Sequence, residues 1–377
     1  MNPLRIASRM ENMVGWFAAS VLTATMVIYA LRRGERPARP QLQLVDPSPA
    51  QEPLDLQLAR AAEPGRGRKA GTPVHIPWQG WKDILLRTYN EILNDRLMAV
   101  AGGVVFYSLL SLFPAIAAGV SSYALFFDPE SVAKQVAFAA GVVPSNVLDM
   151  FRDEIMRIAN KSDGKLTFGF AIGLAIALWS ANAGMKSMFD ALNIIYDEQD
   201  KRGIIKLNLV SLFFTVCAIA AALLAAAAVV VFPLVLAALG LSALDRPFIG
   251  LLRWPLMFLM LIVGLAVLYR YGPSRRLAKW RWISVGSVFA ALVWLAASAL
   301  YSWYLSNFAN YNATYGALGA VAGLMMWMWI TTLVVLAGAE LNAEIEHQTA
   351  RDSTIGRPKP LGTRGAVMAD TVGAAQG

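Results

Sequence analysis

Long stretches of the chain contain no ionised side chain. Asp, Glu, Lys and Arg are absent from residues 97–127, 166–185, 207–244 and 282–339. A helix needs about 20 predominantly apolar residues to cross the roughly 30 Å hydrocarbon layer of a membrane. A helix at the surface of a soluble core would carry charges on one face every few residues, which these windows lack. The pattern therefore predicts an all-α, polytopic membrane protein.

The apolar windows divide into six core transmembrane helices. The expected spans are Leu97–Phe127, Leu166–Met185, Leu207–Leu239, Leu251–Tyr269, Trp282–Leu305 and Tyr315–Ala339. Pro114 falls inside the first span and Pro233 near the end of the third, where a proline kinks or ends a helix. Two amphipathic stretches, 147–158 and 185–195, are expected to lie flat among the headgroups or to cover one end of a cavity.

A seventh apolar stretch, Met13–Leu31, precedes this core. The basic cluster that follows it, residues 32–39, is stronger than the one before it. A cleaved signal peptide has its basic residues chiefly in front. We interpret residues 1–32 as an uncleaved anchor helix that spans the membrane; a helix lying in the plane of the membrane is the alternative.

Residues 33–77 and 348–377 differ from the core in composition. The first segment contains eight prolines among Ala, Gln, Arg and Glu, and the second is rich in Gly, Pro and Arg. Because neither segment has much apolar surface to bury, we expect a disordered linker and a disordered tail. Between them, an amphipathic helix is expected from Trp78, at the start of a membrane domain over residues 78–347; its apolar face holds Trp81, Leu85, Tyr89 and Ile92.

Basic residues lie mostly on one side of the six expected spans. If segment 32–96 is inside, the loops and tail on that side hold Lys186, Lys201, Arg202, Lys206, Arg270, Arg275, Arg276, Lys279, Arg281, Arg351, Arg357, Lys359 and Arg364. The long segment 128–165 on the other side has five basic and six acidic residues. The positive-inside rule therefore predicts a bacterial inner membrane protein with its linker and tail in the cytoplasm. The net charge of +8 then faces anionic lipid, and no nucleic acid partner is expected.

Metal and redox chemistry have few candidate residues. The single cysteine, Cys217, lies in an apolar run, and the two histidines, His75 and His347, lie outside the apolar runs. We therefore expect no disulfide within the chain, no metal site and no cofactor.

Several different short motifs follow one another along the core. They are Asp95-Arg96, Ala101-Gly102-Gly103, Phe106 to Pro114, Trp179-Ser180-Ala181, Ala191 to Tyr196, Trp280-Arg281-Trp282 with Gly286, Tyr311-Asn312, Tyr315 to Gly319, Trp327, and Gly338 to Asn342. In this order and spacing the chain resembles the YihY/virulence factor BrkB family, historically labelled ribonuclease BN, from about Trp78 to His347. The resemblance implies a six-helix inner-membrane protein with a role in envelope integrity and in lipid or solute export. The anchor helix and linker are additions to the family pattern.

Polar residues inside the spans are candidates for lining a cavity. Tyr107, Ser111 and Pro114 share one face of the first span, and Ser108, the residue after Tyr107, is rotated from that face by one helical position. This face either lines a cavity or tunes packing at a proline kink, because hydroxyls can satisfy a carbonyl that a proline leaves free. Asn182 and Trp327 are the candidates on the second and sixth spans, where they line an interior crevice or fill the core.

Charged residues occur only at the ends of the spans. Asp95 and Arg96 open the first core helix, and Glu340 closes the sixth at the same expected depth. At that depth an acidic residue and Arg96 could form an ion pair, or these charges could gate a cavity. The alternative is that the side chains simply extend to the membrane interface. The centre of every span lacks Asp, Glu, Lys, Arg and His, which disfavours a proton antiporter built on a carboxylate.

These observations favour a non-enzymatic membrane protein that contacts lipids and translocates a lipid-like or amphipathic solute. The alternative is a non-catalytic envelope scaffold that docks partners on its linker and outer helices. Ribonuclease activity is disfavoured because the only acidic cluster between helices, residues 197–200, lies in a short loop beside two basic residues. The sequence is also compatible with a homo-oligomer.

Overall fold

The described part of the chain is built from helices. The computed structural model describes residues 52–124, 166–238, 245–308 and 317–376, and every structural statement below concerns these residues. The short helices are α2 (Leu54–Ala61), η2 (Pro73–His75) and α13 (Val367–Asp370); the longer ones are α3 (Trp78–Asn94), α4 (Leu97–Ala124), α7 (Leu166–Ile195), α8 (Ile204–Ala238), α9 (Asp245–Tyr271), α10 (Trp280–Phe308) and α12 (Ala317–His347). The expected anchor helix Met13–Leu31 and amphipathic stretch 147–158 lie outside the described residues.

Three of these helices are long and apolar enough to cross a membrane on their own. Their qualifying segments are Ile204–Leu224, Trp280–Asn307 and Val321–His347. A fourth candidate combines α3 with Leu97–Leu112 of α4 across a bend of 59°. Together with the absence of strands from the described residues, this confirms a helical, multi-pass membrane protein; the number of six core spans stays a prediction.

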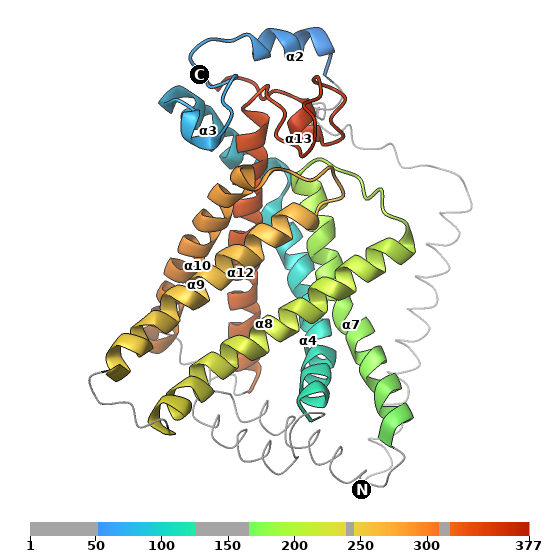
Figure 1. Ribbon diagram of the computed structural model, residues 1–377, viewed down its shortest axis with the longest axis vertical. Coiled ribbons are helices and arrows are strands. Elements are labelled where there is room, and N and C mark those ends of the chain that lie inside the picture. The colour runs from blue at the N-terminus through green and yellow to red at the C-terminus, as the bar shows by residue number, and fades with distance from the viewer. Residues whose placement is uncertain (1–51, 125–165, 239–244, 309–316, 377) are drawn as a thin grey trace, which may run out of the picture. The chain divides into compact units, whose positions relative to one another are not determined.

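The long helices pack as a continuous bundle (Figure 1). α4 lies along α7 and α10 lies along α12, while α8 packs on α7 and α9 packs on α10. α12 also contacts α4, which joins the two halves of the bundle. Leucine, valine and phenylalanine side chains remain exposed along the outer faces, for example Leu209, Phe213, Leu259 and Val263. Such faces suit contact with lipid tails, where apolar exposure carries no cost.

The start of α9 at Asp245, the end of α12 at His347 and the end of α7 depart from the expected spans. α7 continues to Ile195, where the sequence predicted a span ending at Met185 and a separate amphipathic stretch. The stretch belongs to α7 because Phe189, Leu192 and Ile195 are buried against the bundle. α8 extends past Pro233 to Ala238, so this proline does not end the helix.

The end of α7 and the bend after α3 share a backbone feature. Asp197 and Arg96 both have φ of 51°, a left-handed conformation that side chains other than glycine adopt rarely. After α7, the Glu198 N–H donates to the Asn193 carbonyl at 2.8 Å and the Asp197 N–H donates to the Ile194 carbonyl at 3.0 Å. This bonding satisfies the last carbonyls of the helix and stops it.

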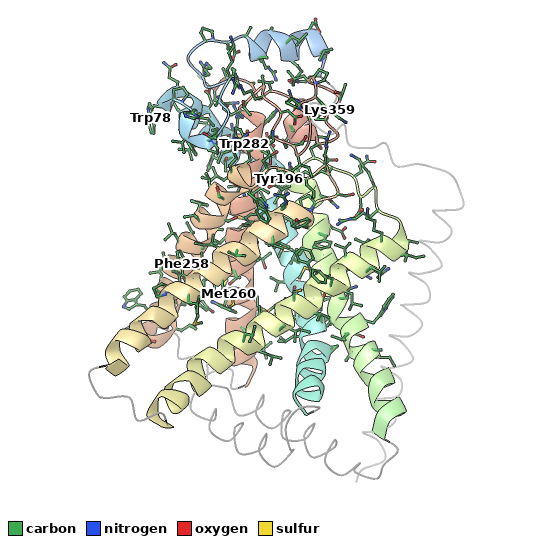
Figure 2. The ribbon with its side chains drawn as sticks, viewed as in Figure 1. Trp78, Tyr196, Phe258, Met260, Trp282 and Lys359 are labelled. Atoms are coloured by element: carbon green, nitrogen blue, oxygen red, sulfur yellow. The ribbon has the colours of Figure 1, made fainter. Side chains whose placement is uncertain are left out.

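Two clusters of buried apolar side chains hold the bundle together. The larger lies among the long helices and includes Leu97, Leu192, Tyr269, Ile283 and Leu336. The second joins the segment before α3 to α10 and α12; it consists of Ala70, Ile76, Ile84, Trp282, Leu341 and Ile345. Figure 2 shows Trp282 and Tyr196 at the end of the bundle where these groups meet.

The segments flanking the bundle form an ordered polar layer, which we call the cap: residues 52–77, 348–376, and the loops 196–203 and 272–279. The sequence predicted disorder in the linker and tail, and residues 52–77 of the linker and 348–376 of the tail differ from this prediction. The Ala350 N–H donates to the Arg68 carbonyl at 2.8 Å, and the Gly373 N–H donates to the His347 carbonyl at 2.9 Å. Composition is a poor guide here because arginine, carboxylate and backbone hydrogen bonds, rather than apolar area, connect the segments.

Candidate functional site

Ser108 and Ser111 lie where α4 approaches α7 most closely. Ser111 is buried, and its hydroxyl donates to the Ser108 carbonyl at 2.9 Å. A Cβ on Gly184 of α7 would lie 2.8 Å from Ser111 Oγ and 3.0 Å from Ser108 Cα, so glycine is required for this approach. Small residues let membrane helices come together in this way. The Ser111 hydroxyl therefore serves the α4–α7 contact, and not the Leu110 carbonyl that Pro114 leaves free.

Asn182 lies between α7 and α8 with its side chain fully buried. Thr215 Oγ1 is 3.3 Å from Asn182 Oδ1 and 2.9 Å from the Ser211 carbonyl, so one hydroxyl proton serves two acceptors. Asn182 Nδ2 has no hydrogen-bond partner among the described residues. A buried polar group left unpaired costs about 1–3 kcal/mol. We call Ser108, Ser111, Asn182, Ser211 and Thr215 the polar seam.

Tyr107 does not join the polar seam, although it lies one helical turn before Ser111. Its side chain is 49% exposed. Its ring packs edge-on against Phe106, with centroids 5.4 Å apart. Tyr107 thus faces outward from α4 while Ser111 faces α7.

Trp327 lies in a separate contact between α10 and α12. Its Nε1 is 3.4 Å from Ser298 Oγ, and its ring centroid is 6.2 Å from that of Trp294. The indole N–H of Trp294 in turn donates to Thr331 Oγ1 at 3.0 Å. The indole N–H groups of Trp294 and Trp327 thus each have a partner on the neighbouring helix. No contact among the described residues joins Trp327 to Asn182.

Glu340 is buried within the bundle near the cap, and the structure does not pair it with Arg96. The Glu340 residue is 1% exposed, and neither carboxylate oxygen has a hydrogen-bond partner among the described residues. The nearby charges that act on it are the carboxylates of Glu344 and Asp95. Arg96 has an exposed side chain at the bend between α3 and α4. An uncompensated carboxylate at this position is costly and marks Glu340 as a candidate functional group.

The other charges near Glu340 form buried ion pairs that join distant parts of the chain. Arg87 of α3 pairs with Glu344 of α12, and Arg275 pairs with Glu346 at 2.8 Å with both side chains fully buried. Burial alone would lower the pKa of Arg275, but the Glu346 carboxylate outweighs burial and raises it. Sequence reasoning missed these pairs because their members lie 257 and 71 residues apart.

Tyr196 completes this group under the cap. Its ring centroid lies 4.0 Å from the Arg275 guanidinium carbon, a cation–π contact. Burial raises the pKa of the Tyr196 phenol well above its usual value, so the hydroxyl keeps its proton. Tyr196 Oη has no hydrogen-bond partner among the described residues, so it is unsatisfied like the two carboxylate oxygens of Glu340.

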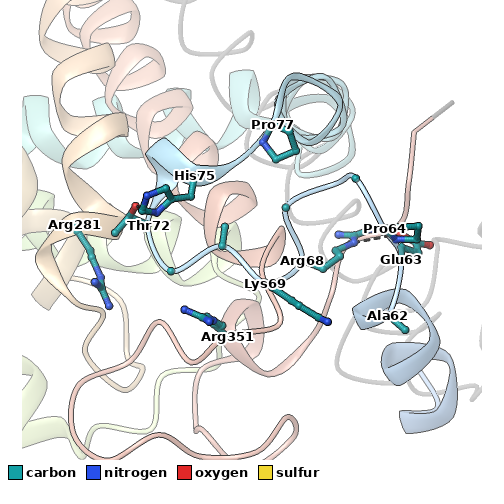
Figure 3. A pocket seen from close by; sticks show the side chains of 14 residues that line it. Ala62, Glu63, Pro64, Arg68, Lys69, Thr72, His75, Pro77, Arg281 and Arg351 are labelled. Atoms are coloured by element: carbon teal, nitrogen blue, oxygen red, sulfur yellow. Dashed lines mark hydrogen bonds and ion pairs between the residues drawn. The ribbon is translucent and has the colours of Figure 1, made fainter.

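A cavity of about 740 Å³ lies in the cap (Figure 3). The loop of residues 62–77 forms most of its wall, with Arg281 from α10 and Arg351 from the tail. A second cavity of about 460 Å³ lies beside the start of α8, lined by Lys206 and Arg276 among others. Sequence reasoning placed these basic residues on one side of the membrane without indicating that they surround cavities. Within the described residues, no group of three or more His, Cys, Asp or Glu could hold a metal ion.

Comparisons with known proteins place this arrangement in a family. The chain matches the model of the family described as virulence factor BrkB over residues 88–361. It is 31% identical to the ribonuclease-like protein YfkH of Bacillus subtilis over 250 residues, 64% of this chain and 86% of that protein. It is 25% identical to a UPF0761 membrane protein of Pseudoalteromonas translucida over 277 residues, 73% of this chain and 88% of the relative.

A third relative is a UPF0761 membrane protein of Vibrio cholerae, 28% identical over 266 residues, 67% of this chain and 84% of that protein. No solved structure matches the chain. The matched region runs from within α3 to the tail and contains the polar seam, Glu340 and the Arg275–Glu346 pair. The chain belongs to the virulence factor BrkB family of membrane proteins.

Proposed function

We propose that the protein translocates a lipid-like or amphipathic solute across the membrane along the polar seam. The observation that carries this proposal is the Asn182 amide, which is fully buried between α7 and α8 with Nδ2 unpaired. An unpaired amide at this depth is a ready donor for the oxygen of a passing polar group.

The surroundings of the seam suit an amphipathic solute. Thr215 and Ser211 of α8 add hydroxyls on the side of the amide, and both are buried. The outer face of α8 exposes Leu209 and Phe213 to the lipid tails. A polar headgroup could therefore follow the seam while its apolar chains stay in the bilayer.

The proposal includes a membrane orientation. The cap carries Lys201, Arg202, Arg276, Lys279 and Arg351, and basic segments of this kind remain on the cytoplasmic side. We place the cap in the cytoplasm of a bacterial inner membrane, with six core spans and residues 1–32 as an additional anchor.

Flux through reconstituted proteoliposomes tests the proposal. Fluorescent phospholipids with zwitterionic and anionic headgroups are loaded symmetrically, and accessibility to an impermeant quencher is followed with time. The variant Asn182→Leu removes the amide at similar volume and should lower flux about tenfold, the equivalent of roughly 1.4 kcal/mol. The control Asn307→Leu, on an exposed Asn of α10, should change flux less than about twofold.

Two results would refute translocation along the seam. Wild-type protein that moves none of the lipids leaves the proposal without support. If the Asn182→Leu variant folds and transports lipid like wild type, Asn182 serves packing alone.

A non-catalytic scaffold is the second candidate function, and the ordered cap favours it. Residues 52–77 and 348–376 form a polar surface outside the bundle that a soluble partner could bind. Crosslinking in membranes that recovers a stable partner from a protein without flux would favour the scaffold over the transporter.

We do not propose nuclease activity, because the acidic loop after α7 is already bonded within the chain. Asp200 pairs with Arg202 at 2.8 Å, and Glu198 pairs with Lys201 at 2.7 Å. Glu198 also accepts the Val367 N–H at 2.8 Å. RNA cleavage by purified protein that is lost in Asp200→Asn would contradict this view.

A further inference from the structure

We propose that the 740 Å³ cavity in the cap binds a phosphate-bearing anion through Lys69, Arg281 and Arg351. The three residues come from the loop before α3, the first turn of α10 and the tail. Figure 3 shows them around one hollow. The site is independent of the polar seam.

The charge of the cavity is strongly unbalanced. Glu63 is the only acid that lines it, and Glu63 pairs with Arg68 at 2.7 Å. Within the described part of the chain, no ion pair or hydrogen bond engages the side chain of Lys69, Arg281 or Arg351. By contrast, the cap arginines Arg66 and Arg275 each pair with a carboxylate. Three cations thus line one cavity without an ion pair to any described carboxylate.

The walls of the cavity are fixed before any ligand arrives. Thr349 Oγ1 donates to the Ala70 carbonyl at 2.8 Å, and Gln348 Nε2 donates to the Arg66 carbonyl at 2.8 Å. Ala70 and Ile76 pack against Trp282, the residue next to Arg281, in the second apolar cluster. Like charges around one cavity repel one another, and a bound anion relieves this repulsion. Because the backbone of the wall is already held in place, binding requires little further ordering of it.

The size and donors of the cavity indicate the ligand class. Small-molecule sites occupy roughly 300–1,000 Å³, so this cavity has room for more than one phosphate group. Arg281 and Arg351 offer planar forks that match phosphate oxygens, and Lys69 adds a point charge. A free phosphorylated solute and a phospholipid headgroup share this chemistry.

Titration of the full-length protein in detergent with sodium pyrophosphate tests the site. Isothermal titration calorimetry should show binding that weakens as salt is raised. Arg351→Gln and Arg281→Gln should each weaken binding about 10-fold to 100-fold, the change expected when one charge-assisted hydrogen bond is lost. Arg351→Lys keeps the charge and should weaken binding less than Arg351→Gln.

The matched control is Arg357→Gln, which removes an exposed tail arginine that does not line the cavity. It should leave affinity within about twofold of wild type, because exposed charges contribute little at a distance. Equal weakening by Arg357→Gln and Arg351→Gln would overturn the proposal, since it would show a general charge effect. If Arg351→Gln does not fold, Arg281→Gln and Arg351→Lys decide the question.

Lipid nanodiscs distinguish the two sources of phosphate. In phosphatidylcholine nanodiscs, pyrophosphate binding that survives addition of phosphatidylglycerol indicates a free solute as the ligand. Phosphatidylglycerol that displaces pyrophosphate from wild type indicates a headgroup. Absence of pyrophosphate binding in both detergent and phosphatidylcholine nanodiscs overturns the site.

Discussion

Replacing Gly286 with alanine should force α10 and α12 apart. The Gly286 N–H donates to Asn342 Oδ1 at 2.8 Å, which ties the two helices at their closest approach. A Cβ at Gly286 would lie 2.1 Å from the Gly338 carbonyl oxygen and 2.5 Å from Asn342 Cγ. The carbonyl oxygen belongs to the backbone of α12, so no side-chain rotation relieves the clash.

The opposing free-energy terms decide the sign of the effect. Alanine is favoured over glycine in a helix by about 1 kcal/mol. Overpacking costs about 1–3 kcal/mol or more, and losing the Gly286–Asn342 hydrogen bond costs about 1 kcal/mol. The net result should be a loss of roughly 2 kcal/mol in the free energy of unfolding.

Unfolding by sodium dodecyl sulfate in mixed micelles, followed by tryptophan fluorescence, measures this loss. The matched control is Gly264→Ala on α9, where a Cβ meets no atom within 4 Å. The control should be neutral or more stable by up to about 1 kcal/mol. Equal stability of Gly286→Ala and Gly264→Ala would show that the helices do not meet as described.

Three further changes probe the cap and the apolar cluster beneath it. Arg87→Gln leaves Glu344 buried without its arginine and should cost about 3–5 kcal/mol in the free energy of unfolding. The double variant Arg87→Met/Glu344→Leu should recover part of this loss, because Arg87 also donates to the Gln348 side chain and the Ala374 carbonyl; no recovery would contradict a contribution from the ion pair. Trp282→Ala should cost about 3–5 kcal/mol while Trp282→Phe costs far less, because the indole N–H has no partner among the described residues; thermal unfolding measures both. Burial alone would raise the pKa of Asp352, but hydrogen bonds from Thr354 and the Lys359 N–H lower it, so its contribution to stability is present above about pH 4 and is lost as the pH falls. Melting temperatures at pH 3 and pH 7 should therefore differ less in Asp352→Asn than in wild type, and an unchanged difference would contradict the assignment.

The sequence predicted the membrane helices well because lipid imposes a simple rule on composition. Windows without charge mark α4, α8, α10 and α12, and their cores match the structure. The boundary at Ile195 was missed because Phe189 and Leu192 fit an interfacial face and a buried face equally well. Only the neighbouring helices decide which face it is.

Candidate residues were harder to predict because helical spacing gives an angle and not a neighbour. Tyr107 and Ser111 are separated by one helical turn, yet only Ser111 is covered by α7. Glu340 was expected at the depth of the interface, and its burial near Glu344 could not be read from the sequence. Its surroundings depend on α3, the tail and α12 meeting, which are contacts that no local pattern encodes.

Two buried arginines, Arg68 in the cap and Arg87 in α3, have a consequence for how the protein is made. Arg68 Nη2 donates to the Gly373 carbonyl at 2.7 Å, and Arg87 Nη1 donates to the Ala374 carbonyl at 2.9 Å. Arg68 leaves the ribosome 305 residues before its acceptor, and Arg87 leaves it 287 residues before its own. During translation they must stay hydrated or rest on other groups while the helices insert. Assembly of this face of the molecule is therefore a late event that follows insertion of the helices. A chain whose synthesis stops within the last turns of α12 lacks the Gly373 and Ala374 carbonyls to which Arg68 and Arg87 donate.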